Sequence, residues 1–140
     1  MEIKEVYEYL GQVRKKEKEI RRHTARMEEL RSCLLPSGIR YDREPVQSSP
    51  SNQMENNMAK IDELERTVLE LLQEKADLVN QISDMIERLE DDNEKTVLME
   101  FYVARHSMEE AAKAINYSLP RTYYFRKIGV RNIGELLSPG

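Results

Sequence analysis

The stretch HSMEEAAKAINYSLPRTYYFRKIGV, residues 106–130, decides the fold that we expect for this chain. Near its start, Ser107 is followed three residues later by Glu110, which is the signature of a capping box. In such a box the serine hydroxyl accepts the backbone N–H of the third helical residue, and the glutamate reaches back to the serine N–H. The pattern therefore predicts a helix over residues 108–115.

A tight turn and a second helix are predicted to follow. The tripeptide Asn-Tyr-Ser at 116–118 is typical of a turn, and Ser118 is the expected N-cap of the next helix. Pro120 falls in the first turn of that helix, where its missing N–H would have no partner in any case. Two short capped helices joined by about three residues form a helix-turn-helix pattern, whose second helix is the candidate recognition helix.

Charge distinguishes this recognition helix from the rest of the chain. Between Ser118 and Arg131 the sequence holds four Lys and Arg residues and no acidic residue, although the whole chain has a net charge of −4. DNA affinity depends chiefly on cations that contact phosphates from one surface, so this local positive charge favours DNA binding. The alternative is an ordinary corner of two helices with a solvated basic face.

The composition favours long, exposed helices over a large globular core. The 140 residues are 39% hydrophobic and 34% charged, and the chain has no Trp. No apolar run approaches the roughly 20 residues that span a membrane, and the N-terminus lacks the basic start and apolar centre of a signal peptide. The single cysteine, Cys33, cannot form an internal disulfide. We therefore expect an all-α, cytoplasmic protein.

Two long helices are predicted before the helix-turn-helix. Residues 2–35 carry apolar side chains at three- and four-residue spacing, and we expect Gly11 not to interrupt this helix. Residues 54–91 show the clearest periodicity in the chain, which is typical of a coiled-coil seam. The expected seam residues are Ile3, Val6, Leu10, Val13, Ile20 and Met27 from the first helix, and Ile61, Leu64, Val68, Leu71, Leu78, Ile82, Met85 and Leu89 from the second.

Neither long helix can bury its apolar stripe alone. The simplest solution is a long antiparallel coiled-coil hairpin, with Met27 near Ile61; the alternative is self-association of the second helix in a homo-oligomer. Residues 36–56 have no apolar period and are expected to form a linker or an ordered loop. The predicted domains are thus a helical hairpin, residues 1–93, and a helix-turn-helix DNA-binding domain, residues 94–140.

The first helix also carries a basic stretch. Residues 14–26 hold seven Lys and Arg residues against two acidic residues. We expect a solvated helix face whose cations pair with acids on a neighbouring helix. The alternative is a second surface that faces phosphates.

Two parts of the sequence resemble known families. The segment TVLMEFYVARHSMEEAAKAINYSLPRTYYF, residues 96–125, resembles region four of bacterial sigma factors, a helix-turn-helix that binds promoter DNA. The segments GIRYDREPVQSSPSNQ at 38–53 and IDELE at 61–65 resemble small phage and prophage proteins of Gram-positive bacteria, related to RinA-like and ArpU-like late-gene transcriptional regulators. The resemblance covers nearly the whole chain and implies a protein that binds double-stranded DNA in a bacterial host cell.

The sigma-like pattern implies roles within the recognition helix. Thr122 and Phe125 would be core positions, and Gly129 would pack against the preceding helix. The chain departs from the pattern after Phe125, where Gly129 and Gly134 are expected to interrupt the helix. Arg121 is the best candidate for a base contact, because arginine can pair bidentately with guanine. The expected DNA-binding residues are Ser118, Leu119, Arg121, Tyr123, Tyr124, Arg126, Lys127 and Arg131.

The sequence predicts no catalytic site, metal site or cofactor. His23 and His106 lie outside any cluster at metal-ligand spacing, and the chain has no Gly-rich phosphate loop and no nucleophile motif. His106 is expected to be a turn residue, with a phosphate contact as the alternative.

Three functions are compatible with these patterns. The first is sequence-specific transcriptional regulation, in particular activation of phage or prophage genes through contact with RNA polymerase. The second is DNA-packaging recognition by a protein like a small terminase subunit, which also combines such a DNA-binding domain with an oligomerising coiled coil. The third is a coiled-coil adaptor with no DNA role.

Overall fold

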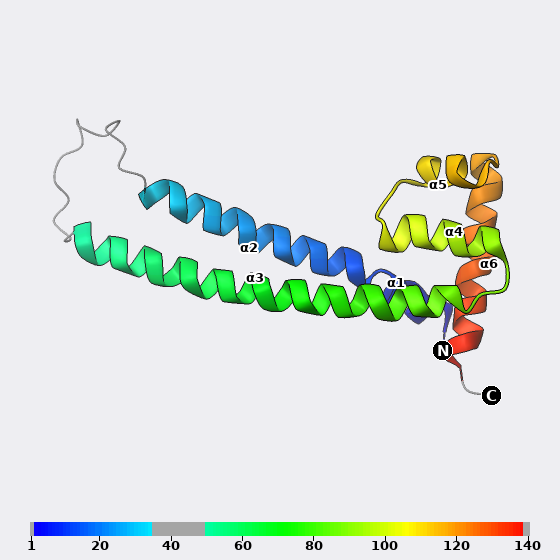
Figure 1. Cartoon of the computed structure of the whole chain (residues 1–140), viewed down its shortest axis with the longest axis horizontal. Helices are drawn as coiled ribbons and strands as arrows, with labels where there is room; N and C mark the ends of the chain where they lie inside the picture. Colours follow the sequence, from blue (N-terminus) through cyan, green and yellow to red (C-terminus); the bar gives the residue numbers. More distant parts are fainter. Residues whose placement is uncertain (1, 35–49, 139–140) are drawn as a thin grey trace. The chain divides into compact units, whose positions relative to one another are not determined.

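The computed structural model of the chain is all-α, as predicted (Figure 1). It describes residues 2–34 and 50–138, and no residue in these ranges lies in a β-strand. Residues 36–49 of the predicted loop lie outside the described residues, whereas residues 50–56 are helical, so the predicted loop ends too late: the next helix begins at Pro50, because proline is well tolerated in the first turn of a helix. In chain order the elements are α1 (Ile3–Leu10), α2 (Gln12–Leu34), α3 (Pro50–Glu87), α4 (Asp92–Leu98), the π-helix η2 (Met99–Val103), α5 (Met108–Ile115) and α6 (Leu119–Leu137).

The chain forms two compact units whose limits differ from the predicted domains. The terminal unit comprises Met1–Glu17 and Glu74–Gly140, and the hairpin unit comprises Lys18–Gln73. The boundary predicted between residues 93 and 94 does not separate the two units. The reason is that α1 and the end of α3 bury side chains in the same core as α4 and α6.

Within the hairpin unit, α2 and α3 lie side by side and run in opposite directions (Figure 1). Met27 of α2 and Ile61 and Leu71 of α3 are buried, as the three- and four-residue spacing predicts. An ion pair between Arg31 and Glu65 joins the two helices. The predicted antiparallel hairpin is therefore confirmed for this part of the chain.

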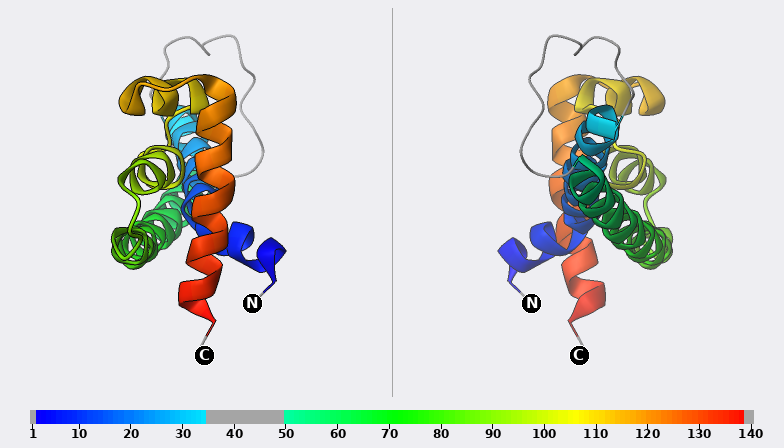
Figure 2. Two further views of the ribbon diagram at one scale, coloured as in Figure 1. Left: turned by 90° about the vertical axis from the view of Figure 1, so that its right-hand side faces the viewer. Right: turned by 90° about the vertical axis from the view of Figure 1, so that its left-hand side faces the viewer.

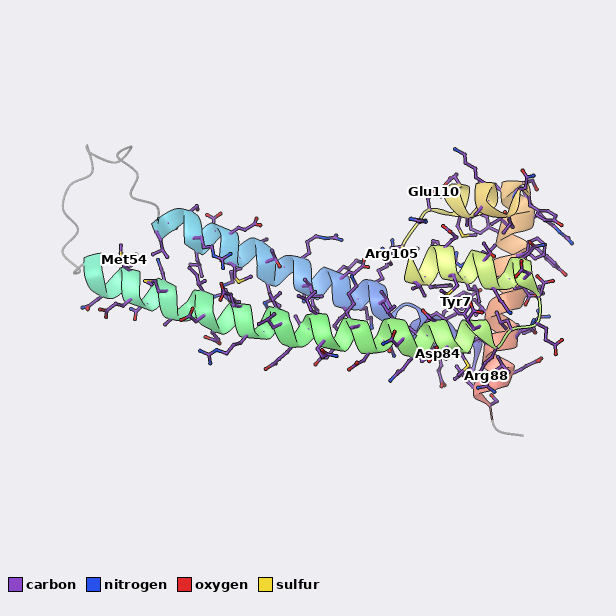
Figure 3. The ribbon with its side chains drawn as sticks, viewed as in Figure 1. Tyr7, Met54, Asp84, Arg88, Arg105 and Glu110 are labelled. Atoms are coloured by element: carbon purple, nitrogen blue, oxygen red, sulfur yellow. The ribbon has the colours of Figure 1, made fainter. Side chains whose placement is uncertain are left out.

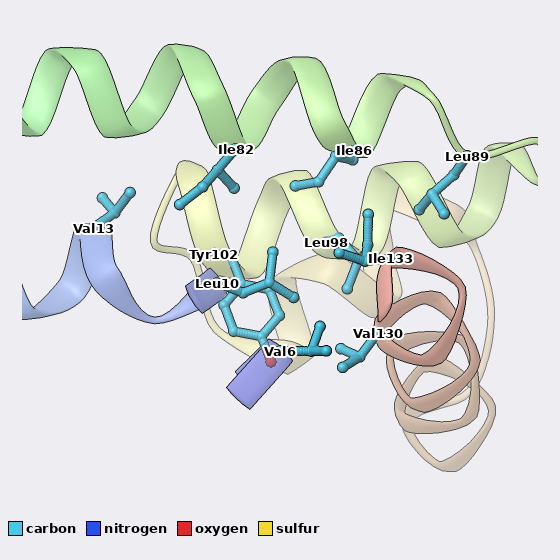
Figure 4. Close-up of a cluster of buried hydrophobic side chains, with 10 residues drawn as sticks. All are labelled: Val6, Leu10, Val13, Ile82, Ile86, Leu89, Leu98, Tyr102, Val130 and Ile133. Atoms are coloured by element: carbon cyan, nitrogen blue, oxygen red, sulfur yellow. The ribbon is translucent and has the colours of Figure 1, made fainter. Parts of the chain in front are cut away.

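A core of buried side chains holds the terminal unit together (Figure 4). It combines aliphatic residues from α1, α2, α3, α4 and α6 with one tyrosine from η2. Complete burial of one such aliphatic side chain stabilises a fold by about 1.5–3 kcal/mol. At the end of α3, Ile86 is fully buried and Met85, the predicted seam residue, only partly, because α3 packs here against more than one partner helix. The core residues are Val6, Leu10, Val13, Ile82, Ile86, Leu89, Leu98, Tyr102, Val130 and Ile133.

The prediction of a single helix over residues 2–35 is wrong, because the helix is divided at Gly11. Gly11 has φ −81° and ψ 1°, so its ψ angle leaves the α-helical region. The division lets α1 bury Val6 and Leu10 in the terminal core, whereas Ile3, expected in the hairpin seam, is 50% exposed. Glycine has a weak helix preference, so a break here costs little and the burial of two aliphatic residues outweighs it.

α6 continues through both glycines that were expected to interrupt it. A Cβ atom added to Gly129 would lie 3.1 Å from Leu98 Cδ1 of α4, and one added to Gly134 would lie 3.1 Å from Val6 Cγ2 of α1. The absent side chains thus let α4 and α1 approach closely, and Figure 2 shows α1 beside the C-terminal half of α6. The packing of Gly129 against a preceding helix is confirmed, and the predicted interruption of the helix is wrong.

Between α4 and α5 the chain forms a π-helical turn, the element η2. The Ala104 N–H donates to the Met99 C=O at 2.8 Å, and this five-residue spacing widens the last turn. The turn carries Phe101 and Tyr102, whose rings meet edge to face with centroids 4.9 Å apart. Short π-helical turns are frequent at functional sites, which makes the surroundings of these two rings a candidate for a binding site.

Candidate nucleic-acid interface

α5 begins with the capping box that the sequence predicted. The Ser107 Oγ accepts the Glu110 N–H at 3.1 Å, and the Glu110 Oε1 accepts the Ser107 N–H at 3.1 Å. The hydrogen bond from the Ser107 backbone N–H to the Glu110 carboxylate is the main cause that holds the pKa of Glu110 below its usual value. The observed helix, Met108–Ile115, has the predicted limits.

The turn after α5 has a defined backbone geometry. Asn116 adopts the left-handed conformation with φ 62°, which asparagine tolerates better than most residues. The Tyr117 N–H donates to the Ala112 C=O at 3.1 Å and the Asn116 N–H to the Lys113 C=O at 3.3 Å, which together form a Schellman motif. Ser118 then caps α6, as predicted. The C-cap of α5 at Asn116 and the N-cap of α6 at Ser118 thus fix the direction of α6 relative to α5.

Buried side chains of α4, α5 and α6 pack beneath the turn between α5 and α6. Phe125 packs in a small core with Val97 of α4 and Met108 of α5. Thr122 is fully buried, and its hydroxyl donates to the Ser118 C=O at 2.8 Å. The implied core positions Thr122 and Phe125 are therefore confirmed. α5 crosses the N-terminal end of α6, and both belong to the terminal unit (Figure 2).

The opposite side of α6 is exposed and basic. Tyr123 and Tyr124 are each 48% exposed, and Lys127 and Arg131 are also exposed. Residues spaced by three and four lie on one face of a helix, so these side chains share a surface. Arg121 is exposed beside them, with its Cζ 4.7 Å from the Tyr124 ring centroid. We call the set Arg121, Tyr123, Tyr124, Lys127 and Arg131 the α6 face.

Three predicted contact residues lie outside the α6 face. Ser118 is exposed, but its hydroxyl is engaged as the N-cap, accepting the Arg121 N–H at 3.3 Å. Leu119 is partly buried against the small core around Phe125. Arg126 points into the terminal unit, where its Nε donates to the Tyr102 hydroxyl at 3.0 Å.

The placement of Arg126 argues against its predicted role as a DNA-binding residue. It is half-buried, and its Cζ lies 4.4 Å from the Phe101 ring centroid, within range of a cation–π interaction. Burial raises the pKa of the Tyr102 hydroxyl, and the hydrogen bond from Arg126 opposes this rise. Arg126 lies on the packed side of α6 although it directly precedes the exposed Lys127, and charge counted along the sequence cannot distinguish the two sides of the helix.

His106 is a turn residue before α5. Its backbone N–H donates to the Glu100 C=O at 2.8 Å, and its Nδ1 pairs with the Glu100 carboxylate. This side-chain hydrogen bond raises the pKa of His106. A carboxylate partner already occupies the imidazole, so the geometry favours the turn role over the phosphate contact.

The sequence-based selection omitted Tyr117. This residue is 46% exposed in the turn, and its ring meets the Phe125 ring edge to face with centroids 5.1 Å apart. The sequence did contain a signal for this residue, namely its position in the turn just before the predicted cap Ser118. Turn residues lie on the surface, and an aromatic ring there can contact a ligand. Tyr117 therefore adds a third exposed tyrosine to the surroundings of the α6 face.

The described residues hold no group of three or more His, Cys, Asp and Glu side chains that could bind a metal ion. In the same part of the chain, no helix is both long enough and apolar enough to cross a membrane.

Comparison with known proteins identifies a family. Residues 53–133 match the family described as "Protein of unknown function (DUF1492)". Neither the curated proteins nor the solved structures compared with the chain gave a match. The matched segment covers more than half of the chain and includes α5, the turn and the α6 face. The chain therefore belongs to the DUF1492 family.

Proposed function

We propose that the protein is a sequence-specific DNA-binding transcriptional regulator, whose α6 face enters the major groove. The observation that carries the proposal is the capped α5–turn–α6 arrangement, which presents Arg121, Lys127 and Arg131 on the exposed side of the second helix, in a stretch from Ser118 to Arg131 that holds no acidic residue. The major groove admits an α-helix, and helix-turn-helix proteins place their second helix there.

The α6 face offers both kinds of contact that DNA recognition needs. Arg121 lies near the N-terminus of α6, the part of a recognition helix that reaches base edges, and its guanidinium can pair with guanine. Lys127 and Arg131 lie further along the helix and suit phosphates, which orient a protein without specifying sequence. The stacking of Arg121 on Tyr124 limits the freedom of the guanidinium before DNA arrives.

The resemblance of the sequence to phage late-gene regulators and to sigma region four narrows the proposal. It supports activation of phage or prophage genes in a bacterial cytoplasm, with RNA polymerase as a second partner. Both refinements rest on the sequence resemblance alone.

The test is to pass fragmented host genomic DNA over the immobilised full-length chain and to sequence the retained fragments. We expect a shared motif in the fragments retained by the wild type. Arg121→Ala should relax the preference at one base position and weaken binding to the motif by about 1–3 kcal/mol. Arg26→Ala, at an exposed position of α2, is the matched control and should retain the same fragments with the same motif.

Two results would refute the proposal. One is the absence of any enriched motif together with no DNA binding at low salt, which would favour the adaptor role. The other is a loss of DNA binding in Arg26→Ala while Arg121→Ala binds like the wild type. This result would place the DNA on the basic stretch of α2 instead of on the α6 face.

One observation favours the packaging alternative. Leu69 and Leu72 of α3 are 65% and 44% exposed, and their three-residue spacing places them on one side of the helix in the hairpin unit. Neighbouring exposed leucines are typical of a surface that associates with another chain. Light scattering of the wild type decides between the roles, because a ring-sized oligomer supports packaging and a monomer or dimer supports regulation.

A further inference from the structure

The terminal unit contains a pocket that the proposed DNA contacts do not use. Its volume is about 210 Å³, and it lies where the break between α1 and α2 faces η2 and α6. Tyr7 and Arg105, two of its lining residues, are labelled in Figure 3. The residues that line it are Tyr7, Leu10, Gly11, Arg14, Phe101, Tyr102, Arg105 and Arg126.

The wall of this pocket is strongly cationic. Three arginines line it, and no Asp or Glu is among the described lining residues. Arg14 and Arg126 form no ion pair with any residue that the structure describes. The third arginine, Arg105, donates from Nε to Glu17 at 3.0 Å, and Glu17 also pairs with Lys75 at 3.6 Å. The carboxylate that pairs with Arg105 is thus shared with a second cation, so the pocket keeps an excess of positive charge.

The backbone holds one of these arginines in an unusual conformation. Arg105 has φ 63°, in the left-handed region that residues other than glycine and asparagine rarely adopt. The next residue, His106, is fixed by its N–H bond to the Glu100 C=O, which closes the turn around Arg105. Strained residues of this kind cluster at ligand-binding sites, and here the strained residue carries a guanidinium at the pocket wall.

Arg126 is pre-oriented by aromatic rings. Its Cζ lies 4.4 Å, 5.4 Å and 5.7 Å from the ring centroids of Phe101, Tyr102 and Tyr7. The Nε donates to Tyr102, so the outer N–H groups of the guanidinium remain for a ligand. A guanidinium held in this way loses little freedom when it binds an oxyanion, and its planar fork matches phosphate oxygens.

We propose that this pocket binds the phosphoryl group of a small molecule, with Arg14, Arg105 and Arg126 as its ligands. The volume lies below the roughly 300–1,000 Å³ of pockets that enclose a whole drug-sized ligand, and suits a phosphoryl group with little else. The ring faces that could stack on a base are partly covered by Arg126. Free phosphate and a nucleoside monophosphate share this chemistry, and the experiment separates them.

The test is isothermal titration of the full-length protein with inorganic phosphate and, separately, with adenosine monophosphate. The wild type should bind phosphate in the millimolar range or tighter. Arg14→Ala should weaken binding about tenfold, as expected for the loss of one charge-assisted hydrogen bond. Lys15→Ala removes a neighbouring exposed cation that does not line the pocket, and should leave the affinity unchanged. Arg14 is exposed, so its variant should fold, and thermal unfolding of both variants checks this.

Each outcome has a defined meaning. Tighter binding of the monophosphate than of phosphate assigns a nucleotide-like ligand, and equal binding assigns free phosphate; both support the proposal. Absence of phosphate binding by the wild type, or equal weakening by Arg14→Ala and Lys15→Ala, overturns it. Loss of duplex DNA binding in Arg14→Ala, without phosphate binding by the wild type, would mean that the pocket contacts a DNA backbone instead. The phosphate and monophosphate titrations contain no DNA, so a failure of phosphate binding is distinguishable from a failure of the proposed DNA-binding function.

Discussion

Gly134 of α6 lies directly against Val6 of α1, and a Cβ atom added to the glycine would be 3.1 Å from Val6 Cγ2. This contact joins the N-terminal helix to the helix that carries the α6 face. It also explains why Val6 is fully buried although the chain enters α1 only three residues earlier. The α6 face is therefore supported by side chains from both ends of the sequence.

The first prediction concerns this close approach. Gly134→Leu should destabilise the protein by about 1–3 kcal/mol, because the larger side chain cannot fit beside Val6 without moving α1. Glu135→Leu, at the exposed neighbouring position, should change the unfolding free energy by no more than about 0.5 kcal/mol. Urea unfolding curves of the two variants provide the comparison. Equal stability of the two would show that α1 does not pack on α6 in solution.

The second prediction concerns the seam of the hairpin unit. Leu71→Ala should cost about 2–5 kcal/mol, because Leu71 is only 7% exposed and its loss leaves a cavity between α2 and α3. Leu69→Ala, two residues away and 65% exposed, should cost no more than about 0.5 kcal/mol in a monomer. Thermal or urea unfolding measures both. The reverse order of effects would mean that Leu69 is the buried seam residue, for example in a homo-oligomer.

The third prediction is a pH dependence from His106. Its pKa is raised above the ordinary value of about 6.5 by the hydrogen bond to Glu100, so protonation favours the folded state. The contribution is fully present below about pH 6.5, and it is lost as the pH rises through the raised pKa. Glu100→Gln and His106→Gln should each remove this dependence, as seen in melting temperatures between about pH 5.5 and 8. A wild type whose pH profile matches that of both variants would contradict the pairing.

Local signals in the sequence were sufficient for the helix-turn-helix. The capping box at Ser107, the cap at Ser118 and the span of α5 follow from contacts within a few residues, and these were predicted correctly. The buried positions Thr122 and Phe125 followed from the sigma-like pattern and are also correct. The antiparallel pairing in the hairpin unit followed from apolar periodicity, which depends on a single partner helix.

Long-range packing determined what the sequence did not predict. The three glycines at 11, 129 and 134 look alike in a helical pattern, yet one marks a break and two allow another helix to approach. Helix preference alone cannot separate these roles, since the deciding atoms belong to Leu98 and Val6. Arg126 was assigned to DNA for the same reason: its charge was visible in the sequence, but the aromatic rings around it come from α1 and η2.

The most direct measurement of the central claim is the salt dependence of binding to a duplex that carries the enriched motif. Wild type, Lys127→Ala and Arg26→Ala are titrated at several salt concentrations, and the logarithm of the association constant is plotted against that of the salt concentration. If the α6 face contacts phosphates, Lys127→Ala should flatten the slope by about one unit, while Arg26→Ala keeps the wild-type slope. A wild type without affinity at low salt, or a Lys127→Ala slope equal to that of the wild type, would contradict DNA binding by the α6 face.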